Sequence, residues 1–356
     1  MGNRALVHRG CRRGADGVET RNSDLETQNA RGRPVAFLQV DLDGLWAVRR
    51  CYGVSGSPEQ DDPVYSHALP ALLDLFDRLA VKATFFVVGA DAEVAWKRRH
   101  LEVALERGHE LANHSMTHTL PSHETANPER ETRNAESELA TCQRTLGETL
   151  GIEARGHRTP GYAFSPALLE TLERLGFWYD ASQLPTPWGW FMRWVGRRIS
   201  ARPQPGTRNA KRETQYGSVR DWHAPLRPYR PQFSGHNTQP GVSNSVWEIP
   251  ISVWPTWRLP FHGSMGYRLG RRWVNGALRS LQQGEGFLNY VVHGMDLVDG
   301  RMWNVTPTRM GQWLFSGGAR ERLDFFVETF RQITQGFEVR RTDHWVEQAR
   351  KSVENR

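Results

Sequence analysis

The sequence predicts an α/β protein whose parallel strands close, or nearly close, into a barrel. Short apolar runs alternate with amphipathic helical stripes along most of the 356 residues, and this alternation indicates a parallel sheet. The strand-like runs number seven, or eight with the last, which suits a barrel. Acidic, basic and histidine side chains also stand at the carboxyl ends of several runs, the edge where such barrels carry their functional groups.

The predicted strands are short and rich in Val, Phe, Leu and Ala. They comprise residues 35–41, 83–88, 110–113, 154–158, 177–180, 246–253, 287–292 and 337–340. The predicted helices lie between them and carry apolar residues three and four positions apart. They comprise residues 65–80, 92–107, 128–150, 166–175, 267–283, 319–334 and 343–351. Gly108, Gly151 and Gly176 follow three of these helices, where glycine commonly ends a helix.

The composition is that of a globular protein with an ample core, at 38% hydrophobic and 24% charged residues. No run approaches about 18 apolar residues, so no transmembrane helix is predicted. The three cysteines, Cys11, Cys51 and Cys142, are odd in number and lack Cys-x-x-Cys spacing. This pattern argues against a disulfide framework or a thiolate zinc site and favours a reducing compartment.

One domain is predicted for residues 34–349, with a leader at 1–33, an irregular insertion at 185–244 and a tail at 350–356. The leader has no apolar core and mixes seven Arg with four acidic residues. It therefore resembles neither a secretory signal nor a transit peptide. We expect it to be disordered, or to lie upstream of the native start.

The formal net charge of +7 suggests an acidic partner or substrate. The excess is local, because ten Lys and Arg lie between Trp188 and Arg230 against only Glu213 and Asp221. The alternative is a solvated, irregular surface.

Aromatic and basic residues are interleaved at the start of this basic stretch. They are Trp188, Trp190, Phe191 and Trp194, with Arg193, Arg197 and Arg198. Such a segment could rest in a membrane interface or bind a sugar phosphate. Alternatively, the tryptophans form the core of a small subdomain.

Two carboxylates and two imidazoles form the candidate reaction centre. Asp41 and Asp43 stand two positions apart at the end of the first strand, so both can face the same way. His114 and His118 are four positions apart, which on one helical turn would let both reach a single ion. Asp43 and the two histidines would leave metal positions open for water and substrate. Asp41 would then be free to act as a base, as in a hydrolase.

Neither pair is specific alone, since 13 histidines give roughly 0.4 His-x-x-x-His pairs by chance. Arg158, Asp180 and His293 add weight because they also end predicted strands. Each has an alternative role: Arg158 as a structural ion-pair residue, Asp180 as a turn residue and His293 as a core histidine. His157 points away from Arg158 in an extended segment, so we expect it to be structural. Asp296 is expected to cap a helix or turn.

These residues resemble the motifs of the polysaccharide deacetylases of the NodB-homology type, carbohydrate esterase family 4, from about residue 34 to residue 349. The matching motifs are Asp41-Leu42-Asp43-Gly44, His114-Ser115-Met116-Thr117-His118, Arg158-Thr159-Pro160 and Val291-Val292-His293. Many members have adjacent aspartates, whereas Leu42 separates them here. This Asp-x-Asp form resembles the branch that contains deformylases and deacetylases of lipid-linked amino sugars. It also resembles some relatives of the peptidoglycan deacetylases.

The resemblance implies a distorted (β/α)7-type barrel, related to the TIM barrel, that binds a divalent metal, most commonly zinc. It implies Asp43, His114 and His118 as metal ligands, Asp41 as the base, His293 as the acid and Arg158 as the partner of Asp41. It also implies a backbone N–H donor to the oxyanion. That donor is Gly161 or Tyr162 in this chain, where many members have an aromatic residue directly after the Arg-x-Pro motif.

The function implied is a metal-dependent hydrolase that removes an N-acyl group, acetyl or formyl, from an amino sugar in a glycan or lipid-linked glycan. The alternatives are an O-acetyl esterase or cyclic amidase with the same site, and a non-catalytic carbohydrate-binding barrel. Specific nucleic-acid binding is not expected, because no recognition module is present. We expect an N-acylated, anionic sugar substrate and a cytoplasmic protein that can touch the membrane surface.

Overall fold

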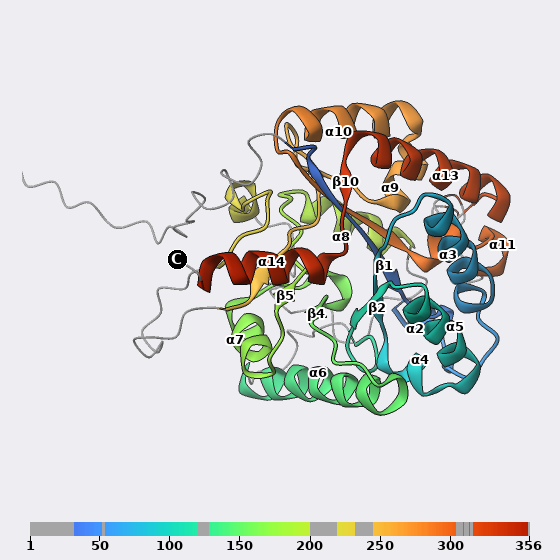
Figure 1. Ribbon diagram of the computed structural model, residues 1–356. Helices are drawn as coiled ribbons and strands as arrows, with labels where there is room; N and C mark the ends of the chain where they lie inside the picture. The colour runs from blue at the N-terminus through green and yellow to red at the C-terminus, as the bar shows by residue number, and fades with distance from the viewer. Residues whose placement is uncertain are drawn as a thin grey trace, which may run out of the picture.

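The structure is a computed structural model, and it describes residues 32–51, 54–119, 128–199, 219–231, 245–303, 309, 313 and 316–354. The predicted leader lies outside the described residues except for its last two positions, and the predicted insertion is described only in part. In the described part, a curled parallel sheet is surrounded by helices (Figure 1).

The sheet has eight strands in the described part of the chain, and every pairing within it is parallel. The strands are β1 (Val35–Leu42), β2 (Thr84–Val87), β3 (Glu110–Asn113), β4 (Gly156–His157), β5 (Tyr179–Asp180), β6 (Trp247–Glu248), β9 (Phe287–His293) and β10 (Glu338–Val339). They follow the order β10-β1-β2-β3-β4-β5-β6, and β9 also pairs with β1. The predicted distorted barrel is confirmed.

The segment after β6 nearly closes the barrel against β9. The backbone N–H of Ser252 donates to the Asn289 carbonyl at 3.1 Å. The Asn289 side-chain amide donates to the Ile249 carbonyl at 3.2 Å. Because these contacts do not form a continuous ladder, the predicted strand at 246–253 is wrong in extent. Only Trp247–Glu248 joins the sheet, and Val253–Trp254 (β7) pairs instead with Leu259–Pro260 (β8) in a separate antiparallel hairpin.

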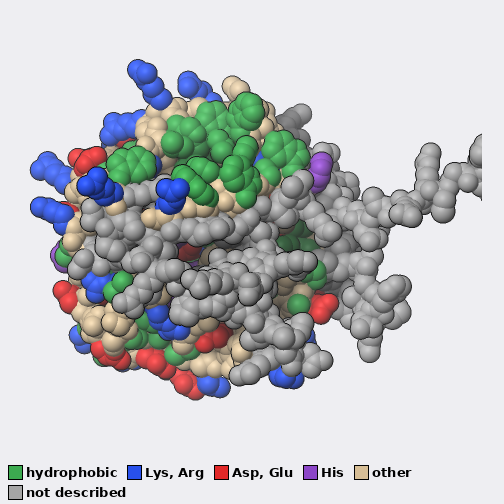
Figure 2. Space-filling view, turned by 180° about the vertical axis from the view of Figure 1, so that it is seen from behind, with side chains coloured by type: hydrophobic (Ala, Val, Ile, Leu, Met, Phe, Trp, Pro, Cys, Tyr) green, Lys and Arg blue, Asp and Glu red, His purple; other side chains and the backbone are tan. Residues whose placement is uncertain are grey.

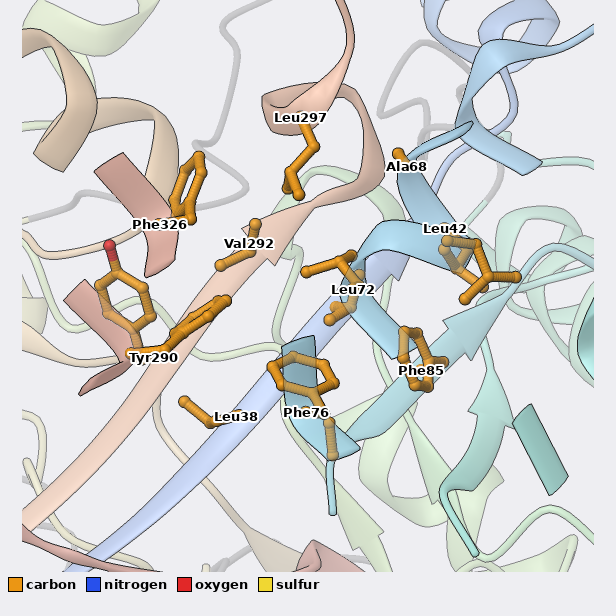
Figure 3. Packing of buried hydrophobic residues seen from close by; sticks show 14 of the residues in the cluster. Leu38, Leu42, Ala68, Leu72, Phe76, Phe85, Tyr290, Val292, Leu297 and Phe326 are labelled. Carbon is orange, nitrogen blue, oxygen red and sulfur yellow. The ribbon is translucent and has the colours of Figure 1, made fainter. Parts of the chain in front are cut away.

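Side chains of the long strands alternate between the two faces of the sheet, as strand geometry requires. On β1, Leu38, Val40 and Leu42 face the outer hydrophobic layer, together with Tyr290 and Val292 of β9 (Figure 3). Phe37, on the other face of β1, packs inside the barrel with Phe86, Tyr179, Trp247 and Trp345. Asp41 shares the parity of Phe37, so the alternation directs this carboxylate into the barrel.

The helices of the described chain lie mostly where the apolar periodicity predicts them. They are α2 (Leu45–Cys51), α3 (Leu69–Arg78), α4 (Gly89–Glu93), α5 (Ala95–Glu106), α6 (Pro128–Leu150), α7 (Pro166–Arg174), α8 (Gly189–Ile199), α9 (Gly263–Leu269), α10 (Arg271–Gln283), α11 (Gly300–Trp303), α13 (Ala319–Gly336) and α14 (Thr342–Glu354). Short helical turns are η1 (Val64–Ala68), η2 (Pro160–Tyr162), η3 (Val219–His223) and η4 (Gly294–Leu297). No described helix is long and apolar enough to cross a membrane.

Three helical predictions need correction. The predicted helix at 267–283 is broken at Gly270, whose φ of 85° an α-helix cannot contain. The insertion is not wholly irregular, because it contains α8 and η3. The last helix continues to Glu354, into the predicted tail.

α14 covers the end of the barrel opposite the polar strand ends. The Thr342 hydroxyl accepts from the Gln39 amide at 3.1 Å, and the backbone N–H of Asp343 donates to Glu110, the first residue of β3, at 3.2 Å. The barrel is therefore filled from this end, and its free end carries the carboxyl termini of the strands.

Phe76 on α3 tests the outer hydrophobic layer. It is fully buried, and its ring centroid lies 5.3 Å from that of Phe330 and 6.2 Å from that of Phe85. We expect Phe76→Ala to lower the free energy of unfolding by about 3–5 kcal/mol, because it leaves a cavity. Trp313→Ala, at a side chain that is 59% exposed, should change it by about 0.5 kcal/mol or less. Urea denaturation compares the two, and equal effects would contradict this packing.

Candidate active site

Asp43, His114 and His118 converge at the free end of the barrel. One ligand atom from each lies within 4.8 Å of the others. Asp43 Oδ1 is 3.1 Å from His114 Nε2 and 3.2 Å from His118 Nε2. This oxygen is buried and accepts no hydrogen bond from any described residue. An unsatisfied carboxylate oxygen between two imidazole nitrogens suits a divalent cation, so the residues fit the metal that the motifs imply.

The two histidines do not lie on a helical turn, so that prediction is wrong. They belong to the loop after β3, in which Ser115 and His118 have positive φ values of 62° and 52°. The Asn113 side chain accepts from the Ser115 N–H at 2.9 Å, and the Ser115 hydroxyl accepts from the His118 N–H at 3.1 Å. Glu138 of α6 accepts from the Thr117 N–H at 2.8 Å. These side-chain bonds replace the helical ladder and aim both imidazoles at Asp43.

Hydrogen bonding fixes which nitrogen of His114 faces Asp43. His114 Nδ1 lies 2.8 Å from the backbone carbonyl of Arg158. A carbonyl can only accept, so Nδ1 carries the proton and the lone pair of Nε2 is left for a cation. For His118, Nδ1 lies 3.7 Å from Cys51 Sγ.

Asp41 is held by the buried Arg158. Arg158 Nη1 lies 2.7 Å from Asp41 Oδ1, and Nε donates to the Ala181 carbonyl at 2.8 Å. The remaining Nη2 donates to the Gln39 side chain. The guanidinium also lies over the Phe86 ring, with Cζ 4.3 Å from its centroid. This ion pair fixes the orientation of the Asp41 carboxylate and leaves its second oxygen, Oδ2, facing His293.

His293 faces that second oxygen. Its Nε2 lies 3.7 Å from Asp41 Oδ2 and 2.9 Å from the Tyr162 hydroxyl, while its Nδ1 lies 3.7 Å from Asp296 Oδ2. Burial works against the charged ring, but Asp296 and Asp41 outweigh it and raise the pKa of His293 to about 9. His293 is therefore protonated near neutral pH.

Asp296 and Tyr162 have contacts that the sequence did not reveal. Asp296 caps η4, as expected, by accepting from the His293 N–H at 2.9 Å, and the same carboxylate pairs with the His293 ring. The Tyr162 N–H donates to the Thr159 carbonyl at 3.0 Å. Since the Tyr162 N–H is already hydrogen-bonded, it does not suit the expected role of oxyanion donor. Of the two candidates, Gly161 is the one that stays. An aromatic residue near an Arg-x-Pro motif was the only signal for Tyr162.

Asp180 lies next to the centre rather than in it. Its Oδ1 accepts from the Ser182 hydroxyl at 2.6 Å, and it is the register partner of Glu248 on β6. Burial raises the pKa of Asp180 to about 6 and that of Glu248 well above its ordinary value. His157 is buried, with its ring nitrogens 3.2 Å from the Asn113 carbonyl and 3.0 Å from the Thr159 hydroxyl. Its contacts are structural.

A second buried charge cluster lies behind the loop that carries Asp43. Lys97 Nζ is 2.8 Å from Asp62 Oδ2 and 2.6 Å from Asp91 Oδ1, and all three side chains are at most 2% exposed. Asp62 also accepts from the Leu45 N–H at 2.9 Å, and Asp91 accepts from the Trp46 indole at 2.8 Å. The cluster thus holds the backbone directly after Asp43.

Gly44 permits this approach. A Cβ at position 44 would lie 2.8 Å from Asp91 Oδ2 and 2.8 Å from the Trp46 ring, which is closer than real Cβ atoms come. Any larger residue would push the loop away from the cluster and displace Asp43.

Solved structures with a similar fold extend over nearly the whole chain. A structure from Mycobacterium smegmatis assigned to the polysaccharide deacetylases aligns with a TM-score of 0.53 and 16% identity, covering 90% of this chain and 92% of the other. One from Pseudomonas aeruginosa PAO1 with the same assignment aligns with a TM-score of 0.51 and 13% identity, covering 90% and 94%. At these identities the likeness concerns the fold.

Residues 60–179 match the family model described as polysaccharide deacetylase. The predicted resemblance to the polysaccharide deacetylase family is confirmed. The matched stretch contains His114, His118 and Arg158, whereas Asp41, Asp43 and His293 lie outside it and are joined to the others by the geometry described above.

Two named relatives of this family share parts of the chain. A chitooligosaccharide deacetylase from Bradyrhizobium sp. (strain ANU 289) is 42% identical over 79 residues, which are 21% of this chain and 35% of the relative. A peptidoglycan deacetylase from Helicobacter pylori (strain ATCC 700392 / 26695) is 27% identical over 146 residues, 40% of this chain and 47% of the relative. The chain thus spans less than half the length of either relative. The assignment to the Asp-x-Asp branch stays a prediction.

Lys97→Met tests the buried charge cluster. We expect it to lower the free energy of unfolding by about 3–5 kcal/mol, because Asp62 and Asp91 would be left buried and unpaired. Lys82→Met is the matched control, since Lys82 pairs with Asp77 at 3.3 Å with both side chains 42% exposed. It should cost about 0–1 kcal/mol. If urea denaturation gives the two variants equal losses, the cluster does not anchor the loop.

The raised pKa of His293 predicts a loss of stability at alkaline pH. Protonated His293 stabilises the folded state fully below its ordinary pKa of 6.5, and this contribution is lost as pH rises through about 9. The difference in unfolding free energy between wild type and His293→Gln should therefore shrink as pH rises from 6.5 through about 9. It is measured by urea denaturation in the presence of a chelator, and a difference independent of pH would contradict the assignment.

Proposed function

We propose that this chain is a metal-dependent hydrolase that removes an N-acyl group, acetyl or formyl, from an amino sugar of a glycan or lipid-linked glycan. The observation that carries the proposal is the Asp43, His114 and His118 cluster beside an Asp41 that Arg158 holds at 2.7 Å. The family match and the names of the two relatives support the reaction class.

Asp43, His114 and His118 would hold the metal. Two imidazoles and one carboxylate with open positions are a ligand set typical of catalytic zinc, and zinc is the metal we propose. When bound, it would polarise the acyl carbonyl and acidify water.

Asp41 and His293 would divide the proton transfers. Arg158 binds Asp41 Oδ1 and leaves Oδ2 available, so Asp41 would take a proton from the attacking water. His293 carries a proton on the nitrogen that faces Asp41 and would give it to the departing amine. An amine leaves poorly unless it is protonated, so a charged His293 suits an amide substrate. The Gly161 N–H would assist the oxyanion.

Substitutions at Asp41 and Asp43 should distinguish loss of proton transfer from loss of metal binding. We expect Asp43→Ala to lose bound metal and activity together, and Asp41→Asn to keep the metal while losing about 10²–10⁴-fold in kcat, the usual contribution of a general base. Metal is measured by elemental analysis, and acetate release is measured on chitooligosaccharides and peptidoglycan fragments. Full metal content and turnover in Asp43→Ala would refute the site.

Chelation supplies a second measurement on the same protein. Removal of metal should abolish activity, and zinc should restore it. Parallel assays with O-acetylated sugars test the ester alternative, which would be preferred if O-acetyl release exceeded N-acetyl release.

A further inference from the structure

Five aromatic side chains with no role in the proposed mechanism are exposed on three elements. They are Trp190, Phe191 and Trp194 on α8 (60%, 43% and 44% exposed), Trp222 on η3 (41%) and Trp257 in the turn between β7 and β8 (60%). We call this set the aromatic surface. Exposed aromatic residues in such a group mark a site of interaction rather than ordinary surface.

Hydrogen bonds connect the three elements. The Trp188 indole, directly before α8, donates to the Trp257 carbonyl at 2.7 Å. Arg258, in the same turn as Trp257, donates to the carbonyl of Asp221 within η3 at 2.9 Å and to that of Ala224, directly after η3, at 2.7 Å. The aromatic surface is therefore one connected region. In the view from behind, hydrophobic side chains gather on one broad area, with Lys and Arg side chains along its edge (Figure 2).

The side chains of α8 divide between this surface and the site. Met192 packs inward on a small hydrophobic cluster that also receives Tyr162, whose hydroxyl lies 2.9 Å from His293. On the outside, the Trp190 and Phe191 ring centroids are 6.0 Å apart, and Phe191 and Trp194 are stacked at 5.9 Å. The aromatic surface thus lies directly outside a wall of the reaction centre.

Charge decides what kind of partner this surface fits. The sequence of α8, GWFMRWVGRRI, contains three Arg and no acidic residue. The Arg198 guanidinium Cζ lies 4.9 Å from the centroid of the Trp194 ring, so a cation and an aromatic ring are presented together. Tryptophan with arginine is the combination enriched where proteins meet the headgroup region of a membrane. Since a neutral glycan would not require the positive charge, the observations favour an anionic bilayer.

We propose that the aromatic surface docks on the interface of an anionic lipid bilayer and so directs the mouth of the barrel toward a sugar held at that membrane. The docking stands independently of the proposed function, whereas the location of the substrate at the membrane rests on it.

Vesicle flotation with the full chain tests the docking. The probes are unilamellar vesicles of phosphatidylcholine with phosphatidylglycerol, and vesicles of phosphatidylcholine alone. We expect binding to the anionic vesicles, weak binding to the neutral ones, and a loss of at least tenfold for the triple variant Trp190→Ser, Phe191→Ser, Trp194→Ser. Arg198→Glu should also weaken binding to the anionic vesicles. Because it keeps all the aromatic side chains, it provides the test if the triple variant does not fold. Trp313→Ser is the matched control, because Trp313 is equally exposed but lies against Arg268 of α9.

Three outcomes would overturn the proposal. The first is equal binding to both kinds of vesicle, and the second is unchanged binding by both the triple variant and Arg198→Glu. The third is a triple variant that still binds anionic vesicles but no longer binds soluble chitooligosaccharides. This result would make the aromatic surface a carbohydrate-binding site. Asp41→Asn should still bind anionic vesicles. An inactive wild type that binds them would therefore refute the proposed function and leave the docking in place.

Discussion

The buried ion pair between Arg158 and Asp41 is the constraint on which the centre of this structure depends. Neither side chain is more than 2% exposed, and a charge so deeply buried is tolerated only when it is paired and hydrogen-bonded. The guanidinium meets this requirement by contacting β1, β2 and the segment after β5. The pair therefore forms only if these neighbouring strands end at the same level, which the parallel register provides.

The same arrangement gives two adjacent groups opposite charges. Arg158 pairs with Asp41 Oδ1 at 2.7 Å and offsets the negative charge of that carboxylate. His293 stays protonated because Asp296 and Asp41 face its two nitrogens, although burial alone would remove the proton. The residue types alone do not assign a base and an acid; the surrounding charges do. The aspartate and two histidines of the candidate metal site lie next to this pair and are oriented by a separate loop.

The barrel and the meeting of Asp41, Asp43, His114, Arg158 and His293 could be predicted, since parallel strands bring their carboxyl ends to one edge. The geometry of the loop after β3 could not. Its positive φ values at Ser115 and His118 depend on side-chain bonds from Asn113, Ser115 and Glu138. The contact of Tyr162 with His293 and the ion pair of Lys97 with Asp62 join segments far apart in the sequence. Local periodicity therefore does not predict them. Conversely, the helix predicted at 267–283 failed for a local reason, the conformation of Gly270.

Residue 158 takes part in both halves of the centre through different atoms. Its side chain orients Asp41, while its carbonyl oxygen holds the His114 ring in the tautomer that leaves Nε2 toward Asp43. A shift of the main chain here would disturb ligand geometry and proton transfer at once, whereas an exchange of the side chain alone would touch only the latter. The orientation of the ligand His114 and that of Asp41 are thus coupled through residue 158. A redesign of the acid–base chemistry must therefore preserve the backbone position of residue 158.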